Sequence, residues 1–430
     1  MSSRSSTRRM DVFWFATRIN VYAISLTALW TPLNAVLIQQ RISDTVPPTI
    51  QASALGLISL IGIGIAALIQ PMAGRASDVA PFPDRRRPFI VGGTLVDLLV
   101  LIFLWWAPSF TWLFVAYVLL QISSNVAQAA FQALIPDLTP PPQVGLVAGV
   151  KNAFDVLGGA LGLLGVGLLL GLRIGSGATY LFLAVILGLG AALTLVWVPP
   201  IPPLLPPRQA ANVRDLLKRS IAPAAFALDP RRHRAFSLAI VVRFLFLLGF
   251  YPIQRFFFFY LEDRFAVAGA AQRTSFYALG ALLLGAAAAT AAGTLSDRFG
   301  RLIVLRTSIV ISAVGLLGIA FAPSLLALAI VGSLLALGSG AFQAVNWALL
   351  SDHIPPGRGA QFYGFANVAT AGASALAGLF GPLVDALNAL LPASTYLITF
   401  SLAALVTLTS LLPLRRIWTA SPGRSPDTDF

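Results

Sequence analysis

The sequence predicts an all-α membrane protein whose twelve transmembrane helices form two pseudo-symmetric six-helix bundles. Hydrophobic residues make up 57% of the 430 residues and charged residues only 10%, against about 25% charged residues in soluble domains. Mean hydropathy is +0.83. Long apolar segments recur along the chain, and a charged motif that separates two of them occurs in each half. Because a water-soluble fold could not cover so much apolar surface, lipid is the expected solvent.

The apolar segments define the expected spans, since each helical crossing of a bilayer needs roughly 20 apolar residues. Pro108 and Pro323 mark tight reversals at corresponding places, between spans three and four and between spans nine and ten. The expected spans cover residues 14–40, 51–73, 89–107, 110–135, 146–172, 178–198, 236–260, 273–292, 302–321, 324–350, 360–388 and 394–414.

The longest non-apolar stretch, from Pro199 to Arg234, separates the two halves of the chain. It contains a short basic amphipathic pattern, Val213–Ile221, of the kind that lies at lipid headgroups. The polar C-terminal end is expected to be disordered. The predicted organisation is an N-terminal six-helix bundle (1–198), a cytoplasmic central loop (199–234), a C-terminal six-helix bundle (235–414) and a disordered cytoplasmic tail (415–430).

Basic residues are distributed unevenly between alternate loops. On one side the loops hold only Arg41, Arg173, Arg264 and Arg273, whereas both termini and the central loop, on the other side, are rich in arginine. Because basic loops stay in the cytoplasm, we expect a multi-pass protein of the cell membrane with both termini cytoplasmic. The use of arginine in preference to lysine suggests a GC-rich bacterial genome and hence the bacterial inner membrane. The net charge of +13 then reflects topology, and no nucleic-acid partner is expected.

The composition also argues against several kinds of chemistry. The chain has no cysteine, and its two histidines, His233 and His353, both fall in predicted loops. Neither a disulfide framework nor a metal centre is therefore expected. The sequence contains neither a phosphate-cradling glycine loop nor a catalytic triad. We expect no enzyme activity and no cofactor.

A charged motif follows the second span of each half. Each copy places a glycine four residues before an aspartate, with arginines after it, and a further aspartate ends the fourth span of each half, at Asp137 and Asp352. Asp137 and Asp352 are 215 residues apart, as are Pro141 and Pro356, which indicates an internal duplication. The motif residues are Gly74, Asp78, Arg85, Arg86 and Arg87 in the first half and Gly293, Asp297, Arg298, Gly300 and Arg301 in the second.

These charges can form ion-paired clusters at the helix ends. An arginine can bind a carboxylate on a neighbouring helix end through two parallel hydrogen bonds, and Asp137 and Asp352 are the expected acceptors. Such clusters predict a cytoplasmic gate that closes this side while the exterior is open. The alternative is that the charges only set topology and reach towards lipid headgroups.

The twelve spans, the central loop and the duplicated motif resemble the major facilitator superfamily of secondary transporters. The second copy follows that family's Gly-x-x-x-Asp-Arg-x-Gly-Arg pattern from Gly293 to Arg301, with Leu302 in place of the usual last basic residue. The resemblance implies two bundles that alternately open a site between them to each face of the membrane, in a protein that functions as a monomer.

The first copy departs from this pattern, because Val79 follows Asp78 and the basic cluster comes later. Its Arg-Arg-Arg-Pro-Phe ending, with Gln70 and Pro71 ahead of the glycine, is similar to the sucrose-transporter and glycoside–cation symporter branch. The sodium-dependent members of that branch use paired acidic residues on early helices, and spans one, two and four contain no such pair. This difference favours protons, or simple facilitation, over sodium coupling.

In the family resembled here, spans one, four, seven and ten line the solute pathway, and these spans carry polar stripes. Span four places Gln121, Asn125, Gln128 and Gln132 on one helical face. Amides both donate and accept hydrogen bonds, which suits a polyhydroxylated solute, although they also join helices to one another. The candidate solute-binding residues are Trp30, Asn34, Asn125, Gln128, Arg243, Tyr251, Gln254, Gln343 and Asn346.

Three charged residues at membrane depth are candidates for proton coupling, since such residues are costly there and tend to be functional. Asp155 is the first choice; Lys151 lies four residues before it, so the two can pair along one helix face. Asp97 is the second choice. The alternatives are a permanent structural pair for Asp155 and a hydrogen-bonded packing role for Asp97. For Arg243, binding of an anionic group and pairing with a coupling carboxylate both stay open.

Three functions fit these features. The first is a proton-coupled or facilitative carrier for a sugar, a glycoside or a similar small polar solute, with the solute, protons and the lipid bilayer as partners. The second is a proton-driven efflux carrier for apolar or cationic compounds, which the phenylalanine run Phe256–Phe259 supports. The third is a membrane scaffold or assembly factor that transports nothing.

Overall fold

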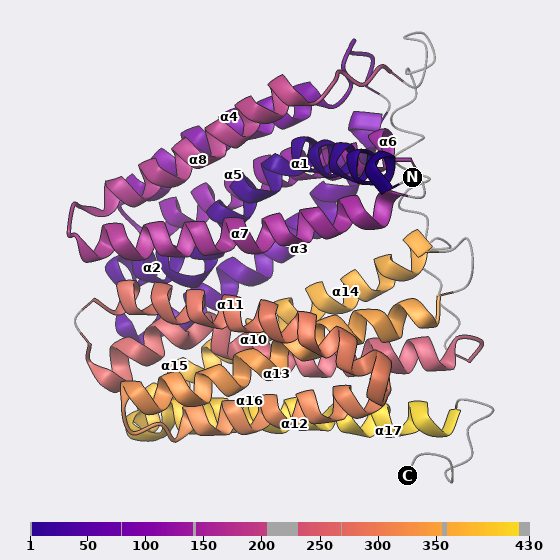
Figure 1. The fold of residues 1–430 in the computed structure, drawn as a ribbon. Helices are drawn as coiled ribbons and strands as arrows, with labels where there is room; N and C mark the ends of the chain where they lie inside the picture. The colour runs from indigo at the N-terminus through magenta and orange to yellow at the C-terminus, as the bar shows by residue number, and fades with distance from the viewer. Residues whose placement is uncertain are drawn as a thin grey trace. The chain divides into compact units, whose positions relative to one another are not determined.

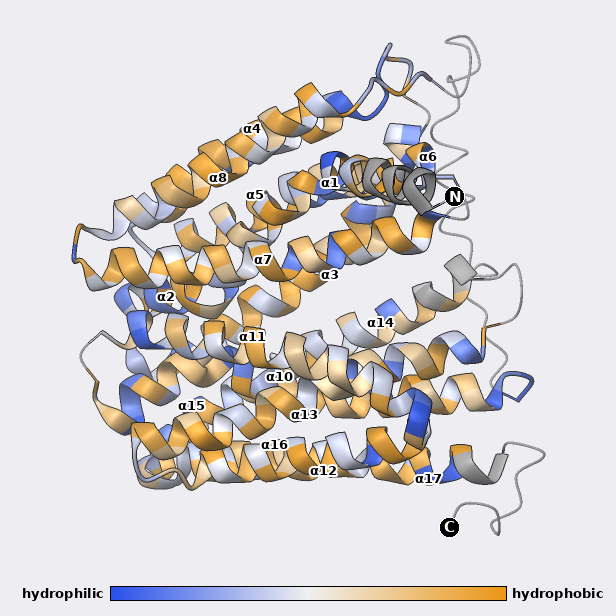
Figure 2. Cartoon of the chain, in the orientation of Figure 1, coloured by the Kyte–Doolittle hydropathy of each residue, from blue (hydrophilic) through white to orange (hydrophobic). Residues whose placement is uncertain are grey.

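The computed structural model describes residues 2–78, 80–140, 143–203, 231–267, 269–354 and 359–420, and all of its regular elements are helical. Twelve segments of this described chain are long and apolar enough to cross a membrane, which confirms the predicted number of spans. Figure 2 shows apolar residues along the lengths of the helices and hydrophilic residues gathered towards their ends. The pattern fits helices whose middles lie in lipid.

The helices of the N-terminal half follow the expected spans with ends shifted by a few residues (Figure 1). They are α1 (Ser2–Pro32), the π-helix η1 (Leu33–Leu37), α2 (Ile38–Thr45), the short η2 (Pro48–Ile50), α3 (Gln51–Asp78), α4 (Arg87–Trp106), α5 (Phe110–Gln132), α6 (Leu134–Leu138), α7 (Val144–Gly171) and α8 (Ser176–Trp197).

The C-terminal half repeats this series, with its eleventh span interrupted at residues 378 and 379. Its elements are α10 (Arg234–Phe265), α11 (Ala270–Phe299), α12 (Arg301–Ala320), α13 (Leu325–Asp352), α14 (Gly359–Ala377), α15 (Phe380–Leu390), η6 (Pro392–Ser394), α16 (Thr395–Thr409) and α17 (Leu411–Ala420).

The expectation of a disordered tail from residue 415 is wrong for residues 415–420, which continue α17 to Ala420. Leu414 and Ile417 are almost fully buried, and α17 packs against α10 and α12. The stretch is therefore an amphipathic helix with basic residues on its other face, and burial of the apolar face stabilises it. The rest of the predicted tail, and the Val213–Ile221 pattern in the central loop, lie outside the described residues.

The first span contains one turn of π-helix, Leu33–Leu37, directly after Pro32. Proline lacks a backbone N–H and so removes one bond from the helical ladder. A π-helical turn widens the helix by one residue, and such turns are frequent at functional sites. Here the turn contains Asn34, a candidate solute-binding residue.

The described chain divides into two compact units. The first comprises the described parts of Met1–Pro47, Ile61–Ile221 and Gly269–Leu279, and the second those of Pro48–Leu60, Ala222–Ala268 and Gly280–Phe430. Helices α3 and α11 therefore contribute residues to both units. The segment Pro48–Leu60, at the start of α3, belongs with the C-terminal helices.

In the first unit, α1 packs along α7 and α8, and α4 packs along α5 and α8. Glycine makes the closest of these contacts possible. A Cβ atom at Gly158 or Gly162 of α7 would occupy the space of the backbone oxygens of Ile24 and Ala28 in α1. These two glycines therefore allow the close packing of α7 against α1.

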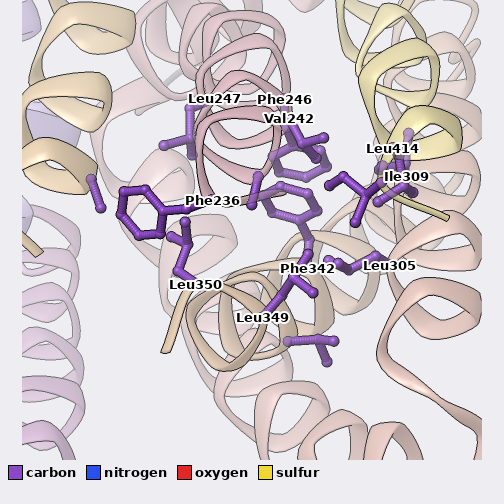
Figure 3. Packing of buried hydrophobic residues seen from close by; sticks show 14 of the residues in the cluster. Phe236, Val242, Phe246, Leu247, Leu305, Ile309, Phe342, Leu349, Leu350 and Leu414 are labelled. Atoms are coloured by element: carbon purple, nitrogen blue, oxygen red, sulfur yellow. The ribbon is translucent and has the colours of Figure 1, made fainter. Parts of the chain in front are cut away.

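In the second unit, α10 packs against α14 and α16, and α12 packs against α13 and α16; α12 and α16 run side by side in Figure 1. A buried hydrophobic cluster joins α10, α12, α13, α14 and α17, and Figure 3 shows part of it. At its centre the rings of Phe246 and Phe342 stack with centroids 3.6 Å apart and planes 11° from parallel. This stack fixes the register of α10 against α13.

Candidate functional site

A hydrogen-bonded chain of polar side chains links α5 with η1 in the first unit. Asn125 donates to the side-chain oxygen of Gln121 (3.2 Å), Gln121 donates to the hydroxyl of Tyr117 (2.9 Å), and Tyr117 donates to Asn34 Oδ1 (3.2 Å). Asn125 and Gln121 are buried, whereas Asn34 is exposed. Two amides of the span-four stripe, Gln121 and Asn125, therefore bond within α5, and the accessible end of this hydrogen-bonded series is Asn34.

Trp30 joins the same group from α1. Its indole N–H donates to Ser124 Oγ at 2.8 Å, and its ring meets the Tyr117 ring edge-on with centroids 6.2 Å apart. Trp30 and Gln128 are half-buried, and none of the described residues forms a hydrogen bond with the Gln128 side chain. The group thus combines an aromatic surface with accessible amides, which can both donate and accept hydrogen bonds.

Asp97 is fully buried on α4 and faces α5. Ser123 Oγ donates a short hydrogen bond to its Oδ1, while Oδ2 has no hydrogen-bond partner among the described residues. Gly93, one turn earlier, allows this close approach, because a Cβ there would lie 2.8 Å from the Cβ of Ala127. A carboxyl group without a cationic partner at this depth is costly, which makes Asp97 a candidate for a functional role.

Lys151 and Asp155 pair along one face of α7, with Lys151 Nζ 2.7 Å from Asp155 Oδ2. Their side chains are 21% and 30% exposed, so the pair is accessible from outside the packed interior. The expected pairing is present, and the geometry is compatible with both a structural and a coupling role.

Arg243 of α10 lies at the centre of a second polar group, in the second unit. The side chain is only 3% exposed. Its Nε donates to Thr370 Oγ1 of α14 at 2.8 Å, and its Nη1 donates to Gln343 Oε1 (3.0 Å) and Asn346 Oδ1 (3.2 Å) of α13. The guanidinium also lies over the Trp347 ring, 4.3 Å from its centroid. Three sequence candidates, Arg243, Gln343 and Asn346, are thus brought together.

The hydrophobic cluster of Figure 3 explains this convergence. Phe246 lies almost one turn after Arg243 on α10, and Phe342 directly precedes Gln343 on α13. Stacking of the two rings therefore aligns the arginine with the amides of the facing helix.

The other candidates of span seven, Tyr251 and Gln254, are not among the described hydrogen-bond partners of Arg243. Tyr251 is half-buried and Gln254 is exposed, two and three turns after Arg243 along α10. The phenylalanine run that supported an efflux carrier is largely packed inside the unit, since Phe256, Phe258 and Phe259 are at most 3% exposed.

The charged motif of the first half forms an ion-paired cluster. Arg86 binds Asp78 (2.5 Å), Asp137 (2.8 Å) and Ser77 Oγ (2.5 Å) through separate nitrogens. Arg85 binds the other oxygen of Asp137 at 2.7 Å. Both arginine side chains are nearly fully buried, so Asp137 is their shared counter-charge.

Arg87 extends the first cluster towards the start of α4. It pairs with Asp84 at 2.9 Å and donates to the backbone oxygen of Val198. Asp84 also accepts from the backbone N–H groups of Arg86 and Arg87, as a carboxylate does at a helix N-terminus.

The second copy of the motif forms the corresponding contacts with one arginine. Arg301 binds Asp352 (2.5 Å), Asp297 (3.1 Å) and Ser296 Oγ (3.0 Å). Arg298 is exposed and lies beside the Phe299 ring. The expected pairing of motif arginines with Asp137 and Asp352 is therefore present in each half.

Of the three motif glycines, Gly74, Gly293 and Gly300, only Gly300 has a backbone conformation that favours glycine. Gly300 has φ of +89°, a conformation that favours glycine. A Cβ atom at Gly293 would meet open space, and at Gly74 it would make an ordinary contact with Ala129 at 3.9 Å.

Several residues in these groups were not among the sequence candidates. Tyr117 could have been found, because it continues the span-four stripe one turn before Gln121. Ser77 and Ser296 precede the two motif aspartates, and the duplication could have identified them. Thr370 could not be found in this way, since only the packing of α14 against α10 brings it to Arg243.

Comparison with known families identifies the chain. A profile described as Major Facilitator Superfamily matches residues 13–290 and 270–429. The chain belongs to the major facilitator superfamily. It is accordingly an all-helical secondary transporter and not an enzyme.

Solved structures of other superfamily members share the fold at low sequence identity. The nucleoside transporter NupG has a TM-score of 0.71 at 14% identity, covering 94% of this chain and 99% of NupG. A bacterial homologue of the human lysosomal transporter Spinster has a TM-score of 0.71 at 14% identity, covering 97% and 99%. A peptide transporter, POT, has a TM-score of 0.70 at 15% identity, covering 95% and 96%. A comparison with curated protein sequences found no match.

Proposed function

We propose that this superfamily member carries a small polar, hydroxyl-rich solute, a sugar or glycoside, by proton-coupled alternating access. The observation that carries the proposal is the group of Trp30, Asn34, Tyr117 and Gln128 in the first unit. It offers an aromatic surface beside amides that can both donate and accept hydrogen bonds. The resemblance of the first charged motif to the sucrose-transporter and glycoside–cation symporter branch supports the same solute class.

Flux measurements on the full-length protein in proteoliposomes test the solute class. Labelled mono- and disaccharides should enter faster than into protein-free vesicles, and Gln128→Ala should raise KM by about tenfold, as for loss of one well-placed hydrogen bond. Gln132→Ala is the matched control, because this glutamine lies one turn away on α5 and its amide oxygen is bonded to Gln70. Equal effects of the two substitutions would contradict the proposed binding role of Gln128.

Proton coupling is assigned to Asp155 as first candidate and to Asp97 as second. Asp155 is partly accessible and has its cationic partner one turn away, so uptake of a proton can open the pair. Asp97 contacts Ser123, and Ser124, the next residue, receives the indole N–H of Trp30. Asp97 is thus connected through two adjacent serines to Trp30, a residue of the proposed solute-binding group.

Separate assays distinguish a coupling residue from a structural one. Asp155→Asn should abolish solute accumulation driven by a pH gradient but preserve counterflow, in which labelled and unlabelled solute exchange without net proton movement. The same two assays on Asp97→Asn test the second candidate. Loss of both activities by Asp155→Asn would show that its pair with Lys151 is structural.

We assign the two arginine–aspartate clusters to the cytoplasmic side, where they act as the gate, with both chain termini on the same side. Breaking a cluster should change the balance between open states. Asp78→Ala should lower the transport rate at unchanged membrane insertion, whereas Asp44→Ala, which removes an exposed partner of Arg41, should leave the rate unchanged. A rate for Asp78→Ala equal to wild type would contradict the gate.

A further inference from the structure

We propose that the transported solute carries an anionic group, a carboxylate or a phosphate, and that Arg243 binds it. This inference rests on the proposed transport function, and it narrows the solute class from neutral sugars to hydroxylated organic anions. It follows from the surroundings of one buried arginine in the second unit.

All described contacts of the Arg243 side chain are with neutral groups. Its described partners are a hydroxyl, two amide oxygens and an indole ring. A guanidinium has five N–H donors, and these hydrogen bonds occupy Nε and Nη1. Nη2 takes part in none of them and is left to bind a further acceptor.

None of the described acidic residues forms an ion pair with Arg243. The described aspartates of the second unit are engaged elsewhere, and Glu262 lies about 28 Å further along α10 at 1.5 Å per residue. The aspartates and their partners are Asp263 with Tyr396, Asp297 and Asp352 with Arg301, and Asp385 with the backbone of Ala52 and Ser53.

A buried cation at membrane depth normally pairs with a carboxylate or with backbone carbonyl groups, because its desolvation is otherwise uncompensated. Arg255, on the same helix, follows this rule. It donates to the backbone oxygen of Ser374 at 2.7 Å, near the C-terminal end of α14, where the helix dipole supplies negative charge. None of the described residues compensates Arg243 in this way, and we infer that the solute supplies its counter-charge.

The geometry around Arg243 suits an oxyanion. The guanidinium carbon lies over the Trp347 ring, and the amide oxygens of Gln343 and Asn346 accept from Nη1, so the side chain is fixed before a ligand arrives. A planar, fixed guanidinium binds carboxylate and phosphate through two parallel hydrogen bonds. A neutral sugar hydroxyl offers no comparable counter-charge.

Binding to the purified full-length protein tests the inference without any need for flux. The probes are glucose, glucuronate and glucose 6-phosphate, which differ only at carbon six, together with inorganic phosphate. Ligands that bind the folded state raise its thermal unfolding midpoint. We expect glucuronate, glucose 6-phosphate or both to bind at least about tenfold more tightly than glucose, as for gain of a charge-assisted hydrogen-bonded pair.

Variants at two arginines make the test specific. Arg243→Gln should reduce anion affinity to that of glucose, and Arg243→Lys should recover part of it, because a lysine keeps the charge and loses the two-pronged geometry. Arg255→Gln removes a charge from the same helix and should preserve the preference for anions. A monodisperse gel-filtration profile identifies the variants that are folded. If Arg243→Gln is not folded, the affinity of Arg243→Lys for the anionic probes is used instead.

The outcomes separate the two proposals. If the anionic probes bind no better than glucose, or if folded Arg243 variants keep the wild-type preference, the inference is overturned. Preferential binding of anions without flux of any probe would uphold the anion site and contradict the proposed transport of this solute class. The relative affinities of glucuronate, glucose 6-phosphate and inorganic phosphate distinguish a carboxylate from a phosphate ligand.

Discussion

The two charged motifs arise from the same repeated pattern, but their clusters differ in burial and in the number of arginines. In the first unit, Arg85 and Arg86 are 4% and 3% exposed at the side chain and share Asp137, which is 16% exposed. In the second unit, Arg301 alone serves two aspartates, and it is 27% exposed while Asp352 is 47% exposed. One cluster is desolvated and the other is largely in contact with solvent.

Because of this difference in burial, we expect the two copies of the motif to contribute differently to stability. A buried ion pair leaves an uncompensated charge when one partner is removed, which is costly, whereas an exposed pair contributes little. The first copy departs from the family pattern by delaying its arginines, and this delay places two of them beyond the helix end, where both reach Asp137. The copy that matches the family pattern better has the more exposed pairs.

The largest expected effect comes from removing the shared carboxylate of the first cluster. Asp137→Asn should lower the free energy of unfolding by about 3–5 kcal/mol, because two buried arginines lose their counter-charge. The matched variant Asp352→Asn should cost about 1 kcal/mol or less. Thermal and denaturant unfolding of the purified protein measure both, and equal losses would refute the contrast.

A third carboxylate separates the effect of burial from that of arginine. Asp385 of α15 is 8% exposed and accepts from the backbone N–H groups of Ala52 (3.1 Å) and Ser53 (2.7 Å) in the first turn of α3. Asp385→Ala should cost about 1–2 kcal/mol, as for loss of a helix N-cap, with faster hydrogen exchange at those two amides. A loss as large as that of Asp137→Asn would show that burial alone sets the cost.

The serines that precede the motif aspartates give a finer comparison. Ser77 accepts from buried Arg86 and Ser296 accepts from half-exposed Arg301. Ser77→Ala should cost about 1–2 kcal/mol, and Ser296→Ala about half as much, because water replaces the lost acceptor at the exposed arginine. Unfolding free energies of the two single variants decide the point; a larger loss in the second unit would reverse the order.

Salt should have the smallest effect on stability, and only on the exposed cluster around Arg301. Raising the ionic strength from about 0.1 M to 1 M shortens the Debye length from about 10 Å to 3 Å. The stability difference between wild type and Asp352→Asn should then shrink by a few tenths of a kcal/mol, while that of Asp137→Asn persists. Unfolding series at several salt concentrations measure this, and an equal salt response would indicate equal burial.

Much of the fold could be predicted from residue patterns. Runs of about 20 apolar residues gave the twelve spans, and the duplicated motif indicated which arginines and aspartates pair. These predictions succeed because span length and charge position are local properties that the bilayer itself selects. Helix ends were less accurate, since polar residues such as Asp78 continue a helix beyond the apolar run.

The candidate sites were predicted in part. The four amides of span four lie on α5 as expected, yet Gln121 and Asn125 bond within that helix. The more accessible side chains of the group are Trp30, Asn34 and Gln128. Pro32 marks an irregularity in span one, but that the next turn is π-helical and contains Asn34 depends on how the helix packs after Pro32.

The amino-acid sequence by itself determined the lipid environment, the number of spans, the repeat and the chemical types available at depth. Tertiary structure alone decided which buried charges have partners. Arg243 and Arg255 look alike in sequence, but packing places a backbone carbonyl of α14 at Arg255, whereas the described partners of Arg243 are neutral side chains. Hydropathy is summed along the chain, whereas the counter-charge of a buried ion depends on atoms that are distant in sequence and a few ångströms away in space.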